Sequence, residues 1–177
     1  MNNLRRGRLD LSSAPRIQSI LCKSSFNIKS GDLLWGMSGS IGETGSLGNF
    51  ARVYEEDLPC QLNQRVGRFN CISSEILIDF LEWLIQSGSF SEQILLYVTG
   101  TAQFNISSEQ VESCMVALPP IAEQIAIKNH LNNCEHRYDS LQKDAELAIG
   151  ILKERRSALI ASAVTGQIDV RGWTPKN

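Results

Sequence analysis

The stretch from Pro119 to Gly166 constrains this chain most, because it predicts a helix longer than a small domain can enclose. Two prolines open it where a first helical turn tolerates them, and Glu123 follows where the helix dipole favours an acid. No other glycine or proline occurs before Gly150, and Gly166 fits a C-terminal stop. About 45 residues at a rise of 1.5 Å give roughly 65 Å. Such a helix needs a partner.

The apolar residues of this stretch recur in alternating steps of four and three. A period of 3.5 residues forms a narrow seam that is typical of a left-handed coiled coil. Arg155 is the one charged residue on this line, and the small pair Ala145 and Ala148 would let two backbones approach closely near its middle. The alternative is a helix packed lengthwise on its own domain. We define the seam as Ile127, Leu131, Cys134, Tyr138, Leu141, Ala145, Ala148, Leu152 and Leu159.

The charge of the chain is uneven. Its formal net charge is −2, yet residues 1–30 carry six bases against one acid, and residues 31–120 carry three bases against eleven acids. A basic face could be assembled locally, but no lysine-rich stripe announces a nucleic-acid binder.

The five cysteines are scattered and never spaced as C-x-x-C, which indicates reduced thiols. No apolar block follows the first arginines, so we expect no signal peptide, and the longest apolar run, Ile94–Val98, is too short for a bilayer. A cytoplasmic protein is the simplest expectation.

The pattern before the prolines predicts an α+β domain over residues 1–118, then a long coiled-coil helix over 119–166 and a tail over 167–177. Within the domain, Gly31–Gly36 reads as a turn and a short strand, and Arg65–Ile72 alternates enough for a second strand. Between them, glycines recur at every third position from Gly36 to Gly48. Turns with positive φ are the main interpretation, and close approach of the backbone to a DNA phosphate is the alternative.

The second half of the domain reads as short helices. The stripe from Ile76 to Ile85 predicts a helix with Ser73–Ser74 as caps and Gly88 as its end. Residues 92–98 fit a helix or a strand, and residues 100–105 read as a loop. Ser107 with Gln110 forms a capping-box pattern, and residues 115–118 predict a final strand.

No residue pattern indicates catalysis. His130, His136 and Cys134 do not share one helix face, so they do not predict a metal site. The acids Glu55–Asp57 precede a proline and read as a solvated turn. The chain is therefore not expected to be an enzyme or to need a cofactor.

Four segments resemble the specificity subunit of type I restriction–modification enzymes. They are G-D-L-L-W-G-M-S-G-S-I-G at Gly31–Gly42, L-N-Q-R-V at Leu62–Val66, G-T-A-Q-F-N-I-S at Gly100–Ser107 running into A-L-P-P-I-A-E-Q at Ala117–Gln124, and L-K-E-R-R-S-A-L-I-A-S-A-V-T-G-Q-I at Leu152–Ile168. The resemblance implies a target-recognition domain for double-stranded DNA without a catalytic centre. Methyltransferase and restriction subunits would supply the chemistry. A complete family member carries two such domains and two long helices that pair antiparallel, whereas this chain carries one of each.

The seam and the resemblance together predict an antiparallel homodimer, because a lone helix would leave the seam in water. Two recognition domains would then read a split palindrome whose gap depends on helix length. Base edges favour Arg, Asn, Gln and Ser, and phosphates favour Lys and Arg. The predicted DNA-binding residues are Arg65, Arg68, Arg52, Ser38, Ser40 and Lys23, with Asn63 and Gln64 either reading DNA or stabilising the backbone.

Three alternatives remain at this point. The chain could be a coiled-coil scaffold protein that binds no nucleic acid, as the acidic balance of residues 31–120 allows. It could be an enzyme that uses a reactive cysteine or the acidic cluster at Glu55–Asp57. It could also be a remnant that binds a methyltransferase but reads no DNA.

Overall fold

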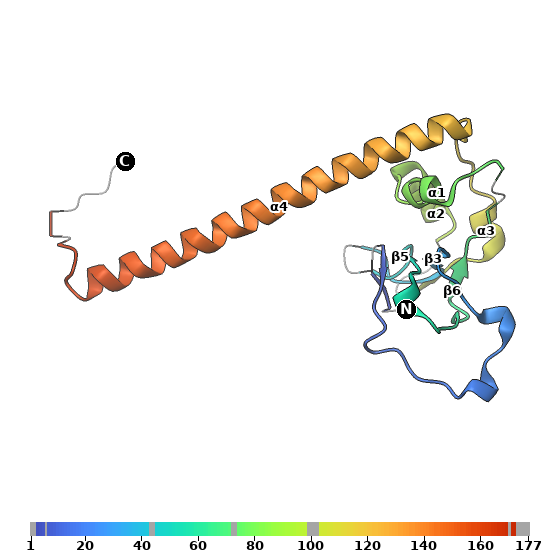
Figure 1. Ribbon diagram of the computed structural model, residues 1–177, viewed down its shortest axis with the longest axis horizontal. Coiled ribbons are helices and arrows are strands. Elements are labelled where there is room, and N and C mark those ends of the chain that lie inside the picture. Colours follow the sequence, from blue (N-terminus) through green and yellow to red (C-terminus); the bar gives the residue numbers. More distant parts are fainter. Residues whose placement is uncertain are drawn as a thin grey trace. The chain divides into compact units, whose positions relative to one another are not determined.

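The computed structural model describes residues 3–5, 7–42, 45–71, 74–98, 103–169 and 171–172. It divides into two compact units, Met1–Lys128 and Asn129–Asn177. The first unit mixes short strands with helices, and the second continues the long C-terminal helix (Figure 1). The predicted α+β class with a long C-terminal helix is therefore confirmed. The predictions for Ser73, for residues 100–102 and for most of the tail concern residues outside the described ranges.

A three-stranded antiparallel sheet lies at the centre of the first unit, in the order β5-β3-β6. Its strands are β3 (Leu33–Gly36), β5 (Phe50–Arg52) and β6 (Val66–Arg68). The strands predicted within Gly31–Gly36 and Arg65–Ile72 are present as β3 and β6, and β6 covers only three of the residues predicted for it. Trp35 of β3 is opposite Phe50 on one side and Gly67 on the other.

Side chains from both faces of this sheet are buried, because neighbouring residues of β3 point to opposite faces. Leu33 and Trp35 pack with the helices that follow, and the Trp35 ring meets Phe90 edge-on at 6.2 Å between centroids. Leu34 faces the other way and packs with Leu4 and Ile28 from the N-terminal segment. That segment is thus part of the core, which its polar composition did not indicate.

The N-terminal segment is attached to the sheet by short elements. Gly7 donates its N–H to the Phe50 carbonyl at 3.0 Å, which places it beside β5. The remaining short elements of the first unit are β1 (Leu4–Arg5), β2 (Arg8–Leu9), η1 (Ser19–Leu21), η2 (Ser24–Phe26), β4 (Ser38–Gly39), η3 (Glu55–Asp57) and β7 (Phe104–Asn105).

The predicted helix after residue 74 is present as α1 (Ile78–Leu84), but its ends differ from the prediction. The N-cap residue is Leu77, without a side-chain cap. Gly88 does not end α1; it begins α2 (Gly88–Leu96), whose cap is the Ser87 hydroxyl accepting from the Phe90 N–H. The segment that the sequence left undecided is therefore a helix.

The capping box at Ser107 is confirmed at the start of α3 (Ser108–Glu112), where Ser107 and Gln110 exchange hydrogen bonds of 3.3 and 2.9 Å. The strand predicted for residues 115–118 was wrong. The Gln93 side-chain amide binds both the N–H and the carbonyl of Met115, each at 2.8 Å. A side chain thus supplies the two bonds that a neighbouring strand would have supplied.

The long helix is present as α4 (Ile121–Val164), 44 residues that begin directly after Pro120. Gln124 in its first turn is fully buried. Its side-chain amide accepts from the Leu77 N–H at 2.9 Å and donates to the Glu75 and Pro119 carbonyls, both at 2.8 Å. These three bonds fix the first turn of α4 to the start of α1. Neither α4 nor any other helix of the described residues has a stretch long and apolar enough to cross a membrane.

Candidate nucleic-acid interface

The turn that precedes β6 presents three of the predicted DNA-binding residues. Asn63, Gln64 and Arg65 are all exposed. The Asn63 carboxamide oxygen accepts from the Arg65 N–H at 3.0 Å, which is the local bond that lets Asn shape a turn. Asn63 thus has the structural role that the sequence left open, and its amide nitrogen is not used in that bond.

The Arg65 side chain is held by a residue far away in the sequence. Its guanidinium donates to the Asn105 carboxamide oxygen at 2.9 Å. Asn105 belongs to β7, which pairs with β4 so that Asn105 is opposite Ser38. Arg and Asn are the side chains that read guanine and adenine edges best, and here they lie side by side on the surface. Sequence reasoning missed Asn105, although it lies within a segment that carries the family resemblance.

Lys23 and Arg68 are linked through Asn27 and Gln61. The Gln61 amide donates to the Lys23 carbonyl at 3.1 Å and to the Asn27 side chain at 2.6 Å. Arg68 donates to the Asn27 carbonyl at 3.0 Å and pairs with Asp32 at 3.3 Å. The exposed Lys23 ammonium is accordingly more available to a phosphate than Arg68, whose charge is already balanced. We call residues 23, 27, 61, 63–65 and 105 the polar surface.

Arg52 is engaged elsewhere. Its guanidinium lies 2.7 Å from the Asp79 carboxylate and 3.7 Å from that of Glu82, and its side chain is only 14% exposed. Lys128 also reaches Asp79, at 3.5 Å. These contacts join β5, α1 and the first turns of α4, so the observed conformation gives Arg52 a structural role.

The two predicted serines differ in exposure. Ser38 is 1% exposed and lies inside the first unit, so it cannot meet DNA without a rearrangement. Ser40, two residues later, is exposed. Its carbonyl accepts from the Leu47 N–H at 3.2 Å, which closes the glycine-rich loop.

The glycines of this loop serve turn geometry and close packing. Gly42 and Gly48 have φ values of +121° and +77°, which only glycine adopts readily. A Cβ on Gly36 would lie 2.7 Å from the Ser46 carbonyl oxygen. The chain itself therefore explains these glycines, as the main interpretation of the sequence held.

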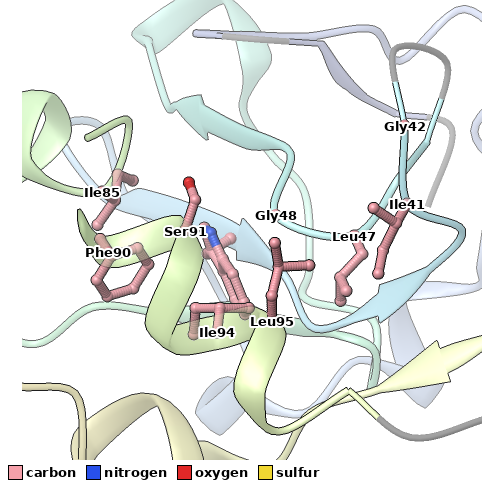
Figure 2. A pocket seen from close by; sticks show the side chains of 10 residues that line it. Ile41, Gly42, Leu47, Gly48, Ile85, Phe90, Ser91, Ile94 and Leu95 are labelled. Atoms are coloured by element: carbon pink, nitrogen blue, oxygen red, sulfur yellow. The ribbon is translucent and has the colours of Figure 1, made fainter. Parts of the chain in front are cut away.

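A shallow pocket of about 200 Å³ lies between the glycine-rich loop and the helices α1 and α2. Figure 2 shows Ile41 and Leu47 on the loop side and Ile85, Phe90 and Leu95 on the helix side. Among the described residues that line the pocket, Ser91 carries the one hydroxyl, and none is an acid, a base or a thiol.

Three of the five cysteines have surroundings that disfavour a nucleophilic role. Burial raises the pKa of the Cys60, Cys71 and Cys114 thiols, which disfavours the nucleophilic thiolate. Asp57 raises the pKa of Cys60 further, whereas Arg52 opposes the increase at Cys71. Among the described residues no group of three or more His, Cys, Asp or Glu side chains could hold a metal.

In the second unit, the seam residues from Tyr138 to Leu159 are exposed, whereas Leu131 and Cys134 are half-buried. Tyr138, Leu141, Leu152 and Leu159 are between 51% and 71% exposed. The C-terminal half of the helix carries further exposed apolar side chains outside the seam, which the 3.5-residue pattern did not reveal. They are Leu147, Ile149, Ile151, Ile160 and Val164.

Comparison with known proteins finds relatives of one family. The chain is 26% identical to the type I restriction enzyme MjaVIII specificity subunit of Methanocaldococcus jannaschii over 81% of its length and 32% of that protein. It is also 26% identical to the EcoKI specificity subunit of Escherichia coli K12, over 94% of this chain and 35% of that protein. The chain thus spans about a third of the length of these relatives.

A solved structure agrees in fold. The HsdS subunit from Thermoanaerobacter tengcongensis superposes with a TM-score of 0.61 over 90% of this chain and 40% of that chain, at 20% identity. The family model for the type I restriction modification DNA specificity domain matches residues 16–147, which include the polar surface and the N-terminal part of α4. The chain belongs to the family of type I restriction–modification DNA specificity domains.

Proposed function

We propose that this chain is a non-catalytic DNA-recognition subunit that positions methyltransferase and restriction subunits on a split DNA target. The family match over residues 16–147 carries the proposal, because it includes both the polar surface and the start of the helix that follows. Two observations support this role: an exposed arginine–asparagine pair of the residue types that read base edges, and three half-buried thiols whose pKa is raised.

The polar surface would read the DNA. Arg65 and Asn105 would contact base edges, and Lys23 would contact a phosphate. Arg65 and Asn105 support this assignment because both are exposed and the 2.9 Å bond between them holds their planar groups together. Further contacts would come from residues beside β4 and β6, namely Ser40, Asn63 and Gln64. Arg68 would contribute mainly by its hydrogen bond to the Asn27 carbonyl.

The long helix would join two copies and bind the methyltransferase. An antiparallel homodimer would cover the exposed seam and place one polar surface toward each end of a fixed spacer, so that the target becomes a split palindrome. The apolar residues outside the seam, from Leu147 to Val164, would remain for a helix of the methyltransferase subunit. A two-stranded coil alone would leave these side chains in water. This exposed apolar surface supports binding of a further helix.

The experiment is to combine the chain with a type I methyltransferase subunit from the same genome and sequence the methylated sites on random DNA. The proposal predicts one inverted-repeat motif with a fixed gap. It also predicts DNA affinity that falls steeply as salt rises, because phosphate contacts release counterions. Methylation at a single continuous motif by a dimeric chain would contradict the split target.

A scaffold protein without DNA binding is the second candidate, which includes a remnant that still binds the methyltransferase. It is favoured by one observation: Arg52 and Arg68 are both paired with acids within the chain, which leaves few free cations on the described first unit. It predicts that the chain co-purifies with the methyltransferase yet shows no salt-dependent DNA affinity.

A further inference from the structure

One charged residue lies on the line of the seam, where a two-stranded coil should not tolerate it without a partner. Arg155 stands at the position where the steps of four and three, continued from Leu152, require an apolar side chain. A charged group enclosed by aliphatic side chains is costly unless something compensates it. Whatever covers the seam must therefore offer a group that accepts a cation.

The spacing of the seam reads the same in both directions. Counted outward from the point between Ala145 and Ala148, the steps are four, three and four toward either end. An antiparallel partner with the same sequence would therefore match these seam positions when its two-fold axis passes through that point. The resulting facing pairs are Ala145 with Ala148, Leu141 with Leu152, Tyr138 with Arg155, and Cys134 with Leu159.

We propose that a second copy of this chain docks on the seam in this one register, so that Arg155 of each copy lies over the Tyr138 ring of the other. The inference rests on the proposed homodimer and specifies its partner and alignment. Tyr138 supports it because the ring is 71% exposed on the isolated helix. The chain already uses the same chemistry in its first unit, where the Arg8 guanidinium lies 4.1 Å from the centre of the Tyr54 ring.

Charge complementarity also selects this register. In an antiparallel coil, the residues that flank the seam on one side face each other across the two copies. Here Glu135 would flank Arg156 of the second copy, and both side chains are exposed on the helix. This facing pair adds an interhelical ion pair to the coil.

Neighbouring registers lose these matches. Sliding the second copy by seven residues in one direction puts Arg155 against Leu131, and sliding it the other way puts Arg155 against Ala145. Neither residue accepts a cation, so both alternatives leave the arginine enclosed without compensation. The aromatic residue thus fixes the alignment as well as the association.

The native Cys134 allows a direct test by disulfide crosslinking in the full chain. The parent variant is C22S, which removes the exposed Cys22. Adding L159C to this parent places a thiol opposite Cys134 of the second copy. Adding L152C instead gives the matched control, because its partner in the proposed register is Leu141. Each variant is oxidised with copper–phenanthroline, and the linked peptides are identified by mass spectrometry.

In the L159C variant, we expect a dimer that is linked between Cys134 of one copy and the introduced thiol of the other. In the L152C variant, we expect no link between Cys134 and the introduced thiol. Such a link in L152C, a link between the two Cys134 side chains in the parent, or a dimer by sedimentation that L159C does not crosslink would each overturn the proposed register. A chain that sediments as a monomer would overturn the homodimer itself, so the two failures are distinguishable.

A coupling measurement tests the arginine–tyrosine pair separately. Because each dimer contains two such pairs, Y138A and R155A should each raise the dimer dissociation constant by roughly fivefold to thirtyfold. The dimer dissociation constant of the double variant should be no higher than that of the single variant with the higher constant. Independent, multiplying effects would show that the two residues do not meet.

Discussion

The two units of this protein use apolar residues in different ways. In the first unit, Leu33 and Trp35 alternate along a strand and are 0% and 3% exposed, because helices of the same chain cover them. In the second unit, Leu141 and Leu152 recur with equal regularity along a helix, yet they are 60% and 62% exposed. Regular spacing therefore predicts that a face will be covered, but not which molecule will cover it.

The difference separates two kinds of stability. The first unit gains its burial within one chain, so its unfolding free energy is independent of concentration. In the proposed homodimer the seam would gain its burial only on association, so its contribution would depend on mass action. Substitutions in the two regions should consequently change different measured quantities, and that distinction can be tested.

The largest effect is expected at the seam. In the proposed dimer, Leu141 of each copy faces Leu152 of the other. L141D would therefore replace one leucine in each of these two pairs and enclose two carboxylates. It should weaken self-association by more than about a thousandfold. The unfolding of the first unit should stay the same. The matched control is K143D, which adds the same carboxylate on an exposed position outside the seam. Sedimentation velocity measures the dimer fraction of both variants. Equal dimer fractions in L141D and K143D would contradict the distinction between the seam and the rest of the helix surface.

The next largest effect is expected at Gln124, where the first unit holds the start of α4. Q124A leaves the Leu77 N–H and the Glu75 and Pro119 carbonyls without their partner. It should lower the unfolding free energy of the first unit by about 2–4 kcal/mol, because buried polar groups then lack bonds.

The control for that variant is Q86A, which removes an exposed glutamine whose side chain bonds to the Glu82 carbonyl. Its expected cost is below about 0.5 kcal/mol. Urea unfolding followed by tryptophan fluorescence suits both variants, since Trp35 and Trp83 lie in the first unit. Equal midpoints for Q124A and Q86A would show that the buried amide stabilises nothing.

A smaller effect should separate two arginines of the first unit. If Arg65 reads a base as proposed, R65A should weaken DNA binding by roughly tenfold, because that exposed group is lost. R52A should leave DNA affinity within about twofold but destabilise the first unit, since Asp79 and Glu82 lose their cation. Fluorescence anisotropy with a duplex that carries the methylated motif measures the affinities. A larger loss of DNA affinity in R52A than in R65A would indicate that DNA contacts the region of β5 and α1 instead of the polar surface.

The smallest effect is expected where Arg8 lies over the Tyr54 ring and 3.2 Å from Glu56. Both contacts are exposed, so R8A should reduce the unfolding free energy by only about 0.5–1 kcal/mol. R5A, which loses one exposed ion pair with Asp10, serves as its control. A loss above about 2 kcal/mol for R8A would mean that the N-terminal segment stabilises the core more than its contacts indicate.

Local signals predicted the elements that have local causes. The proline pair precedes the start of α4, and the Ser107 hydroxyl caps α3 as expected. The predictions that were wrong concern segments whose structure depends on residues far away in the sequence. Gln124, 47 residues away, binds the backbone at the start of α1, and the Gln93 amide replaces the strand that residues 115–118 had predicted.

The candidate site shows the same limit. Residue type alone selected both Arg65, at the start of a predicted strand, and Arg52, which follows the glycine array. Only the fold brings Asp79 and Glu82 to Arg52 and brings Asn105 to Arg65. Ser38 was chosen for its hydroxyl, yet strand pairing buries it.

The most direct test of the account is the mass of the intact chain in solution by sedimentation equilibrium at micromolar concentrations. If the seam is an interface for a second copy, the measured mass will be twice the 19.6 kDa of one chain. It will return to the single mass in L141D. A wild-type chain that stays at 19.6 kDa throughout the micromolar range would contradict the homodimer and the split target that depends on it.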